Sequence, residues 1–348
     1  MPNNQRNPFL ILSVIVAGEA IFFLPFVLPR IFRPTILAEY GLNNLELGTA
    51  FSVYGIVAMA SYFFGGPLAD RFSPRSLIAW ALCLTGVGGF FFLFDLSYFH
   101  FLLIYGFWGF TTIFLMWAAM IKATRLWGGH GFQGRAFGLL ESGRGLTAAI
   151  IGLLAIAALS SFPQDQNAGE ALPIKQVIFS VSAFVFLLGL LVAKWMPDVP
   201  QSEQSAHEKI EFRHVLDLMK NPKIWLQGFI IVCAYVGYKM TDDFSLFANQ
   251  VLGFNQIEAA SVGTAALWLR PVFALVAGFA ADRWRVFQVI GACFLFMLLG
   301  GSLMLAGILD SLVIWALFTM MITLVGIYGL RGIYFCALDA SFKFQKNQ

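Results

Sequence analysis

The chain has 348 residues, of which 59% are hydrophobic and only 12% are charged, and its formal net charge is +3. A soluble domain carries about 25% charged residues, so this composition excludes a water-soluble globular protein. The apolar stretches are continuous over about 20 residues rather than alternating over about 10, which favours membrane-spanning helices over a β-barrel. We therefore predict an all-α polytopic membrane protein.

Hydropathy predicts ten membrane-spanning helices. Six precede a long hydrophilic stretch, at 9–28, 47–64, 76–94, 101–121, 136–159 and 174–192. Four follow it, at 224–247, 259–279, 286–309 and 312–337. Loops are predicted between them, notably at 30–46, 65–75 and 122–135. Pro25 and Pro29 are expected to kink or end the first helix, because proline cannot donate a backbone hydrogen bond.

The hydrophilic stretch 197–222 divides the chain into residues 1–196 and residues 223–348. Its apolar residues recur at helical spacing, which indicates a short amphipathic helix lying on the membrane surface. We therefore expect a six-helix N-terminal bundle, a linker, and a C-terminal region of four helices.

A cluster of glycine and charge between the second and third predicted helices recurs 212 residues later. The matching residues of the two copies are Gly66 with Gly278, Asp70 with Asp282, and Arg71 with Arg283. Further upstream, the same offset of 212 relates Gly41 to Gly253, Asn43 to Asn255 and Glu46 to Glu258. A shared register over about thirty residues indicates an internal repeat.

The distribution of Lys and Arg predicts the orientation in the membrane. With the N-terminus in the cytoplasm, fifteen of the 22 Lys and Arg residues fall in cytoplasmic segments, and three fall outside: Arg30, Arg33 and Lys175. This bias follows the positive-inside rule. We expect both chain ends and both charged clusters in the cytoplasm, and the protein in the inner or plasma membrane.

The motif Gly66-x-Leu68-Ala69-Asp70-Arg71-x-x-x-Arg75 resembles the signature loop between helices 2 and 3 of the major facilitator superfamily. The pair Asp282-Arg283 resembles its degenerate copy between helices 8 and 9. This resemblance implies two six-helix bundles, joined by a cytoplasmic linker, that rock about a solute bound between them near the middle of the membrane.

The stretch 127–145 resembles, more narrowly, the organic-anion, organophosphate and nitrate-porter-like branches of that superfamily. The Gly-rich signatures of true nitrate porters are absent, and the second helix has no Arg, so nitrate is not predicted as the solute.

The superfamily usually has twelve helices, so helices 11 and 12 have no counterpart among the ten predicted here. We expect an incomplete C-terminal bundle, caused by an early stop, a frameshift or a partial gene model. The alternative is a genuine ten-helix protein, whose second bundle would expose faces that are built to be packed.

The charged clusters are candidates for a conformational latch, formed by Gly66, Asp70, Arg71 and Arg75 in the first copy and by Asp282 and Arg283 in the second. Charges at such a turn can pair with the ends of neighbouring helices and stabilise one of two states. The alternative is a solvated turn whose charges only mark the end of a membrane span.

Charges inside predicted helices are functional candidates, because each costs about 2.5–3.5 kcal/mol at a helix centre. Glu19 is a candidate for taking up and releasing a proton, with a partner role for a basic side chain as the alternative. Glu141 and Arg144 are spaced for an ion pair on one helical face, and we expect that pair to be structural.

The C-terminal half supplies the candidate solute contacts. Lys239 and Asp242 in the seventh helix are three residues apart, as Glu141 and Arg144 are in the fifth. Arg270 is the strongest candidate for binding an anionic group, and pairing with an acidic side chain is its alternative. Tyr54 and Tyr328 are candidates for lining a cavity. Arg331 is expected to extend to the membrane interface.

The function predicted from these features is secondary active transport of a small polar or anionic solute, coupled to protons or to exchange. The sequence contains no nucleotide-binding, metal-binding or hydrolase motif, so we predict no cofactor, no metal and no enzyme. The expected partners are the solute, a proton and the lipid bilayer, with no nucleic acid, and the protein is expected to be a monomer. The alternatives are an inactive or partial product of such a transporter and a non-transporting membrane sensor or assembly partner.

Overall fold

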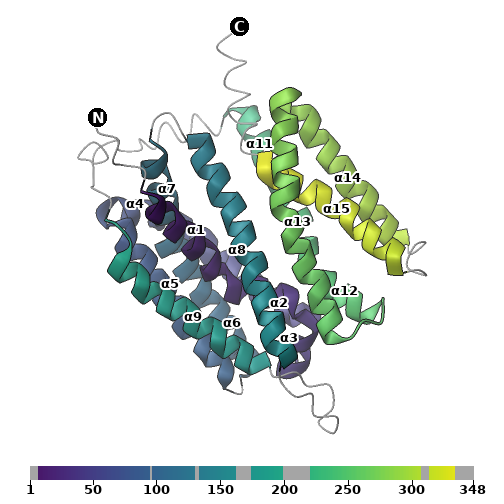
Figure 1. Ribbon diagram of the computed structural model, residues 1–348, viewed down its shortest axis with the longest axis horizontal. Helices are drawn as coiled ribbons and strands as arrows, with labels where there is room; N and C mark the ends of the chain where they lie inside the picture. Colours follow the sequence, from purple (N-terminus) through teal and green to yellow (C-terminus); the bar gives the residue numbers. More distant parts are fainter. Residues whose placement is uncertain are drawn as a thin grey trace. The chain divides into compact units, whose positions relative to one another are not determined.

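The computed structural model describes residues 7–94, 96–129, 133–161, 174–198, 220–306 and 313–333 (Figure 1). Every regular element in these ranges is a helix. The contacts divide the chain into unit 1, Met1–Ala206, and unit 2, His207–Gln348, which are described separately below. The division lies inside the stretch predicted as the linker. The surface helix expected in that stretch falls at residues outside the described ranges.

Ten helical segments within the described ranges are long and apolar enough to cross a membrane. Six belong to unit 1: Pro8–Ile31, Asn44–Arg71, Pro74–Leu93, Tyr98–Gly128, Ala136–Ala158 and Ile174–Trp195. Four belong to unit 2: Ile224–Gln250, Gln256–Ala281, Val286–Ala306 and Val313–Ile333. Each matches one helix predicted from hydropathy, although several boundaries differ.

The first span does not end at its prolines. It consists of α1 (Pro8–Phe22), a π-helical stretch (Phe23–Val27) and α2 (Leu28–Ile31). Pro25 lies in the π-helical stretch, whose wider turn is a known way to accommodate a break in the regular hydrogen-bond ladder. The helix therefore changes its geometry at Pro25 and continues.

Three segments predicted as loops are largely helical, so those predictions were wrong. Residues 30–46 contain the end of α2 and the whole of α3 (Arg33–Tyr40). The glycine- and charge-rich motif completes α4 (Asn44–Arg71), and only Phe72 and Ser73 separate it from α5 (Pro74–Phe90). Helix α7 (Ala118–Gly128) likewise extends into the predicted loop 122–135. Hydropathy marks only the apolar part of a helix, whereas backbone hydrogen bonding continues into the polar flank.

The internal repeat is confirmed at the level of helix ends. Helix α13 (Gln256–Arg283) has 28 residues, as α4 does, and begins and ends at the repeat-equivalent positions. Both helices start with a capping box. In each one, the Asn side-chain oxygen accepts a hydrogen bond from the backbone N–H of the Glu three residues later, and the carboxylate of that Glu accepts one from the backbone N–H of the Asn. Gly41 and Gly253 precede these caps with φ of 61° and 73°. The residues shared by the repeat therefore shape the chain reversal before each helix.

Helices α5 and α9 (Ile174–Trp195) pack closely in unit 1 because glycines lie at their crossing (Figure 1). A Cβ added at Gly86 would lie 2.8 Å from the backbone nitrogen of Phe186, and one at Gly189 would lie 2.9 Å from that of Cys83. Small residues permit such close approach between membrane helices.

The remaining helices of unit 1 are α6 (Tyr98–Gly109), a π-helical stretch (Phe110–Trp117) and α8 (Gln133–Ser161). Buried aromatic side chains fill the space between α5 and α6. The ring of Trp108 stacks on that of Phe92 with centroids 5.1 Å apart, and its indole nitrogen donates to the carbonyl of Thr85 at 3.1 Å.

Unit 2 is organised around α15 (Val313–Ile333), which packs against both α13 and α14 (Val286–Ala306) (Figure 1). Its first span consists of α11 (Pro222–Lys239), a 3₁₀ turn (Met240–Asp243) and α12 (Phe244–Gln250). Glycines again permit close contact, because a Cβ at Gly332 would lie 2.8 Å from the carbonyl oxygen of Ala274.

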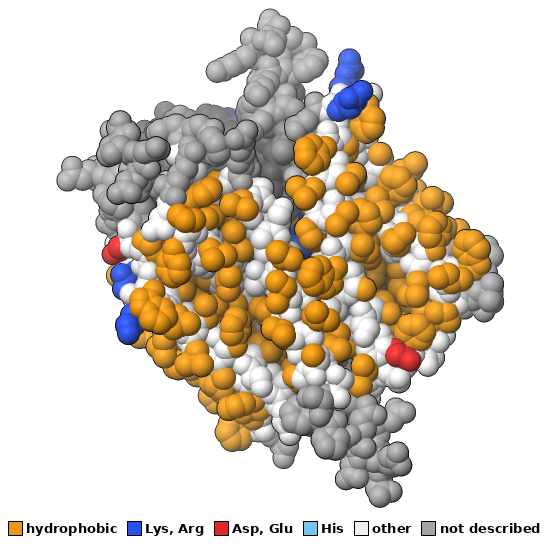
Figure 2. Space-filling model, viewed as in Figure 1, with side chains coloured by type: hydrophobic (Ala, Val, Ile, Leu, Met, Phe, Trp, Pro, Cys, Tyr) orange, Lys and Arg blue, Asp and Glu red, His pale blue; other side chains and the backbone are white. Residues whose placement is uncertain are grey.

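Large hydrophobic side chains cover much of the molecular surface (Figure 2). Leu305 is 91% exposed, Phe63 76% and Phe279 74%. In the face that Figure 2 shows, charged side chains appear mainly at the margins. This distribution suits helices that are surrounded by lipid chains along their length and meet water at their ends.

We predict that Gly86→Ala lowers the free energy of unfolding by about 1–3 kcal/mol, because the added methyl group would overpack the α5–α9 crossing. Gly55→Ala is the matched control, since a Cβ at Gly55 has no atom within 4 Å. The measurement is unfolding in mixed micelles titrated with sodium dodecyl sulfate. Equal stability of the two variants would contradict the proposed packing.

Candidate functional site

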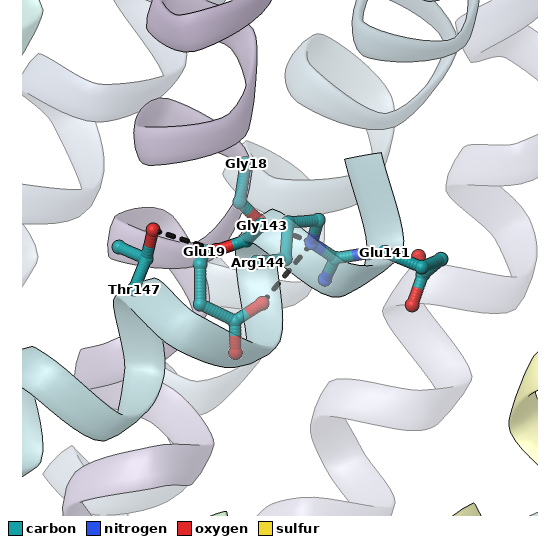
Figure 3. A network of polar contacts seen from close by, with 6 residues as sticks. All are labelled: Gly18, Glu19, Glu141, Gly143, Arg144 and Thr147. Carbon is teal, nitrogen blue, oxygen red and sulfur yellow. Dashed lines mark hydrogen bonds and ion pairs between the residues drawn. The ribbon is translucent and has the colours of Figure 1, made fainter. Parts of the chain in front are cut away.

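Arg144 of α8 lies at the centre of a buried charge network in unit 1 (Figure 3). Its Nε lies 3.0 Å from Oε2 of Glu19 in α1 and donates to the carbonyl oxygen of Gly18 at 3.1 Å. Its Nη1 donates to Oε1 of Glu141 at 2.7 Å. The side chains of Arg144 and Glu19 are 6% and 4% exposed, whereas that of Glu141 is 38% exposed. The buried part of the network is therefore the pair between α1 and α8.

Two aromatic rings lie close to the Arg144 guanidinium. Its Cζ lies 5.4 Å from the ring centroid of Phe22 and 5.9 Å from that of Trp117. Both distances lie within the range of cation–π attraction, which is stronger where water is excluded. Arg144 therefore has both carboxylates and aromatic rings around its guanidinium.

Glycines allow α1 and α8 to approach closely enough for this pair. A Cβ at Gly143 would lie 2.7 Å from a methyl carbon of Ile15 in α1, and one at Gly18 would lie 3.6 Å from Cδ of Arg144 in α8. Thr147 of α8 donates to the carbonyl oxygen of Gly143 at 2.9 Å (Figure 3). Gly143 therefore packs α8 closely against α1.

The structure thus joins two features that the sequence presented separately. Arg144 has the partner expected three residues away, Glu141, and a second partner far away in the chain, Glu19. Of the two interpretations of Glu19, the structure shows the ion pair. A role in proton uptake is compatible with that pair and is considered below.

In unit 2, Lys239 and Asp242 form an ion pair of 2.7 Å at the end of α11. The Asp242 side chain is 5% exposed and that of Lys239 is 42% exposed. Arg270 in α13 is buried, with 4% of its surface exposed, and Pro271 follows it inside the helix. Tyr328 in α15 is fully buried and belongs to a cluster with Phe244 and Leu324.

Tyr54 of α4 is a core residue of unit 1 with its hydroxyl engaged. The hydroxyl lies 2.5 Å from Oγ1 of Thr112, which in turn donates to the carbonyl of Trp108. The ring of Phe26 packs edge-on against Tyr54 with centroids 4.6 Å apart. A role in solute contact for Tyr54 remains a prediction.

The Gly66–Arg75 motif, which spans the end of α4 and the start of α5, is bonded to neighbouring helix ends of unit 1. Arg75 donates from Nε to the carbonyl of Ala193 at 2.8 Å and from Nη2 to that of Lys194 at 3.2 Å, at the C-terminus of α9. Lys122 of α7 donates to the carbonyl of Ala69 at 2.7 Å. Both cations thus lie at the negative end of a helix dipole.

The other latch candidates are more exposed to solvent. Asp70, Arg71 and Arg283 are exposed, and a Cβ at Gly66 has no atom within 4 Å. The side chain of Asp282 lies outside what the structure describes. The described contacts of the motif therefore show a helix-capping function, and the latch stays a prediction.

Arg331 of α15 contacts two aromatic rings of a neighbouring helix. Its Cζ lies 4.1 Å from the ring centroid of Tyr238 and 5.8 Å from that of Tyr235, both on α11. The Arg331 guanidinium therefore links α15 to α11 of unit 2. Its expected extension to the membrane interface stays a prediction.

No group of His, Cys, Asp and Glu in the described part of the chain has an arrangement that could hold a metal ion. Cys83, Cys233 and Cys293 are free thiols, and Cys336 lies outside the described residues. The candidate chemistry of the described residues is therefore that of buried ion pairs and of arginines stacked on aromatic rings.

The Major Facilitator Superfamily model matches residues 9–341. The chain belongs to this superfamily. The resemblance of the Gly66–Arg75 motif is thereby confirmed, as is the all-α polytopic fold. With the ten apolar helices of its described part, this superfamily member is a multi-pass membrane protein.

Two relatives come from Escherichia coli (strain K12). The inner membrane protein YqcE is 24% identical over 266 residues, which cover 76% of this chain and 62% of the relative. The inner membrane protein YihN is 26% identical over 231 residues, covering 64% of this chain and 52% of the relative. The matches thus span between half and two thirds of the length of these relatives.

Solved structures show the same fold. A bacterial homolog of the human lysosomal transporter Spinster, in an inward-facing and occupied conformation, has a TM-score of 0.69 at 15% identity, covering 96% of this chain and 74% of that one. The nucleoside transporter NupG has a TM-score of 0.67 at 16% identity, covering 95% and 80%. At such identities the likeness shows the fold and leaves the solute open.

We predict that Arg144→Ala destabilises the protein by about 3–5 kcal/mol, because it leaves Glu19 as a buried charge without its guanidinium. The double variant Glu19→Leu with Arg144→Met removes both charges and should recover part of that loss. Unfolding by sodium dodecyl sulfate measures both. Glu141→Gln is the control and should cost less, since that carboxylate is more exposed. A double variant no more stable than Arg144→Ala would contradict the pairing.

Proposed function

We propose that this superfamily member is a secondary transporter of the inner membrane, which moves a small polar or anionic solute by alternating access. The family and the transporter folds among its structural relatives support this proposal. Two relatives named as inner membrane proteins support the location. We further propose a monomer with both chain ends in the cytoplasm, on the bias in Lys and Arg.

The observation that carries the proposal is the network of Glu19, Arg144 and Glu141, in which the pair Glu19–Arg144 is buried. Charges inside a membrane protein are costly and mark solute or ion pathways more often than they stabilise the fold. With all three groups ionised, the network holds two negative charges and one positive charge. One proton neutralises the excess, and Glu19 is the more buried of the two carboxylates that can receive it.

The same network offers a coupling mechanism. When Glu19 carries a proton, its attraction for the Arg144 guanidinium falls, and that guanidinium becomes available to a negatively charged group of the solute. When the proton leaves, Glu19 competes with the solute for Arg144. Proton binding and solute binding are thereby linked through one side chain, and the linkage is reciprocal.

Arg75 and the rest of the Gly66–Arg75 motif have a separate place in this proposal. The bonds from Arg75 to the α9 carbonyls brace one end of unit 1. We propose that Asp70, Arg71 and the second copy at Asp282 and Arg283 act as a conformational latch near the cytoplasmic surface. These residues are proposed to set the balance of two states without contacting the solute.

We predict that Glu19→Gln abolishes accumulation of solute driven by a proton gradient but preserves exchange of solute across the membrane. The amide cannot take up a proton, although it can still lie beside Arg144. The measurement is uptake into proteoliposomes from a panel of organic acids, sugars and sugar phosphates, with and without an inward proton gradient. Glu141→Gln is the matched control and should retain gradient-driven uptake.

Gradient-driven accumulation by Glu19→Gln would overturn the coupling role of Glu19. If the unmodified protein exchanges solute across the membrane but shows no uptake driven by a proton gradient, the protein is a solute exchanger and not a proton-coupled transporter. No movement of any solute in the panel would favour the second candidate, a membrane sensor or assembly partner that shares the fold.

We also predict that Arg270→Ala raises the concentration of an anionic solute needed for half-maximal uptake by about tenfold or more, since a hydrogen bond to a charged group contributes about 1.5–3 kcal/mol. The value for a neutral solute should not change. Arg285→Ala is the control, because Arg285 is exposed at the start of α14. Unchanged anion uptake by Arg270→Ala would remove Arg270 from the solute site.

A further inference from the structure

The C-terminal end of α9 in unit 1 carries two cations that come from neighbouring helices. Arg75, at the start of α5, donates from Nε to the carbonyl oxygen of Ala193 and from Nη2 to that of Lys194. Among the described residues, no hydrogen-bond partner meets its Nη1. The Lys194 side chain is itself exposed. Two positive charges therefore lie together at the ends of two membrane spans.

Neither cation is neutralised by a carboxylate in the described part of the chain. Asp70 precedes Arg75 by five residues and Asp198 follows Lys194 by four, but both are exposed and neither forms an ion pair there. Arg75 compensates the negative end of the α9 dipole through the carbonyl groups that it contacts. Lys194 has no carbonyl or carboxylate partner among the described residues, so its charge is available to a group outside the chain.

Exposed tryptophans place this end of the helices at the boundary between lipid and water. The Nζ of Lys194 lies 5.3 Å from the ring centroid of Trp195, which is 56% exposed. Trp80 of α5 is 63% exposed. Tryptophan is enriched at the level of lipid headgroups, and a lysine near the end of a span extends its ammonium group to that level. The two cations therefore lie at the level of the headgroup phosphates.

The register between α5 and α9 shows which residues lie below the cations. A Cβ at Gly86 would lie 2.8 Å from the backbone nitrogen of Phe186, whereas Arg75 contacts the carbonyl oxygen of Ala193. Residue numbers thus rise along α5 as they fall along α9, so the two helices run antiparallel.

This register places Trp80 level with Leu190, which is 48% exposed. Leu190 and Lys194 are four residues apart, so they lie on one face of α9. At a rise of 1.5 Å per residue, they are separated by about 6 Å along the helix axis. Exposed apolar surface therefore begins one helical turn below the exposed cation.

We propose that this surface binds an anionic phospholipid. We call it the Lys194 patch, and it consists of Arg75, Lys194, Trp195, Trp80 and Leu190. The Lys194 ammonium and the Nη1 of Arg75 contact the phosphate of the lipid, since charge-assisted hydrogen bonds to phosphate are the strong ones. The first carbons of the acyl chains lie against Trp80 and Leu190.

The vertical order of charge and apolar surface selects this ligand. A zwitterionic lipid carries a cation of its own, so it is attracted less by two basic side chains. A soluble phosphate has no chains to cover the apolar part of the patch. The proposal concerns the lipid around the protein and does not depend on which solute, if any, the protein moves.

The test measures the thermal unfolding midpoint of the full chain in detergent micelles, by far-ultraviolet circular dichroism, while lipid is titrated. The probes are dioleoyl phosphatidylglycerol, dioleoyl phosphatidylcholine with the same chains, and deacylated phosphatidylglycerol, which is the headgroup alone. We expect phosphatidylglycerol to raise the midpoint most, because a ligand that binds the folded state stabilises it. High salt should reduce this effect by screening the exposed charges.

Equal shifts with the two lipids would overturn recognition of the negative charge. A shift with the deacylated headgroup as large as that with phosphatidylglycerol would assign the patch to a soluble phosphate and overturn its role in binding lipid.

Variants of Lys194 test the cation. Lys194→Gln should weaken phosphatidylglycerol binding about fivefold, since one basic residue near an anionic membrane surface contributes about 1 kcal/mol. Lys194→Arg keeps the charge and should bind as the unmodified protein does. Arg285→Gln is the matched control, because Arg285 is exposed and follows the exposed Trp284 at a span end of unit 2.

Unchanged lipid affinity in Lys194→Gln would overturn the proposal, and so would an equal loss in Arg285→Gln, which would show a general attraction between basic residues and anionic lipid. A lower midpoint of Lys194→Gln without lipid, together with an intact lipid-dependent shift, would assign Lys194 a structural role instead.

A variant of Trp80 tests the apolar part of the patch. Trp80→Ser should weaken phosphatidylglycerol binding, whereas Trp284→Ser should not, although the two tryptophans are 63% and 61% exposed. Equal effects of these two substitutions would contradict a contact between the acyl chains and Trp80. None of these measurements involves transport, so their failure is distinct from a failure of the proposed function.

Discussion

The ion pair between Glu19 and Arg144 is the constraint on which the arrangement of unit 1 depends. A guanidinium and a carboxylate removed from water must meet each other, or the cost of burial is not recovered. Helices α1 and α8 therefore have to lie side by side at this level. Gly18 and Gly143 make that approach possible, and the rings of Phe22 and Trp117 shield the charge from lipid and water.

Arg144 in unit 1 and Arg331 in unit 2 have different surroundings. In unit 1 the Arg144 rim is met by carboxylates, so its charge is compensated within the protein. In unit 2, the Arg331 guanidinium lies against the rings of Tyr235 and Tyr238. Aromatic rings attract a cation through their electron-rich faces.

The residues that recur in the internal repeat position the helices and do not include the buried charge of Arg270. Residues that recur between α4 and α13 form capping boxes and glycine turns, which position the helices. The buried Arg270 does not recur, since its repeat equivalent is Ala58. The two halves thus share the residues that shape the backbone but differ in a buried charge. Such a difference is expected because function depends on the residues of a site and not on the fold that carries them.

The sequence alone determined the membrane class, the ten spans, the repeat and the superfamily, because these depend on composition, length and local motifs. It also indicated the pairs Glu141 with Arg144 and Lys239 with Asp242, since residues three apart share a helical face. Only the tertiary structure joined Glu19 to Arg144, Arg75 to the end of α9, and Arg331 to its tyrosines. Membrane helices are apolar on nearly every side, so their sequences say little about which face meets which neighbour; packing decides it.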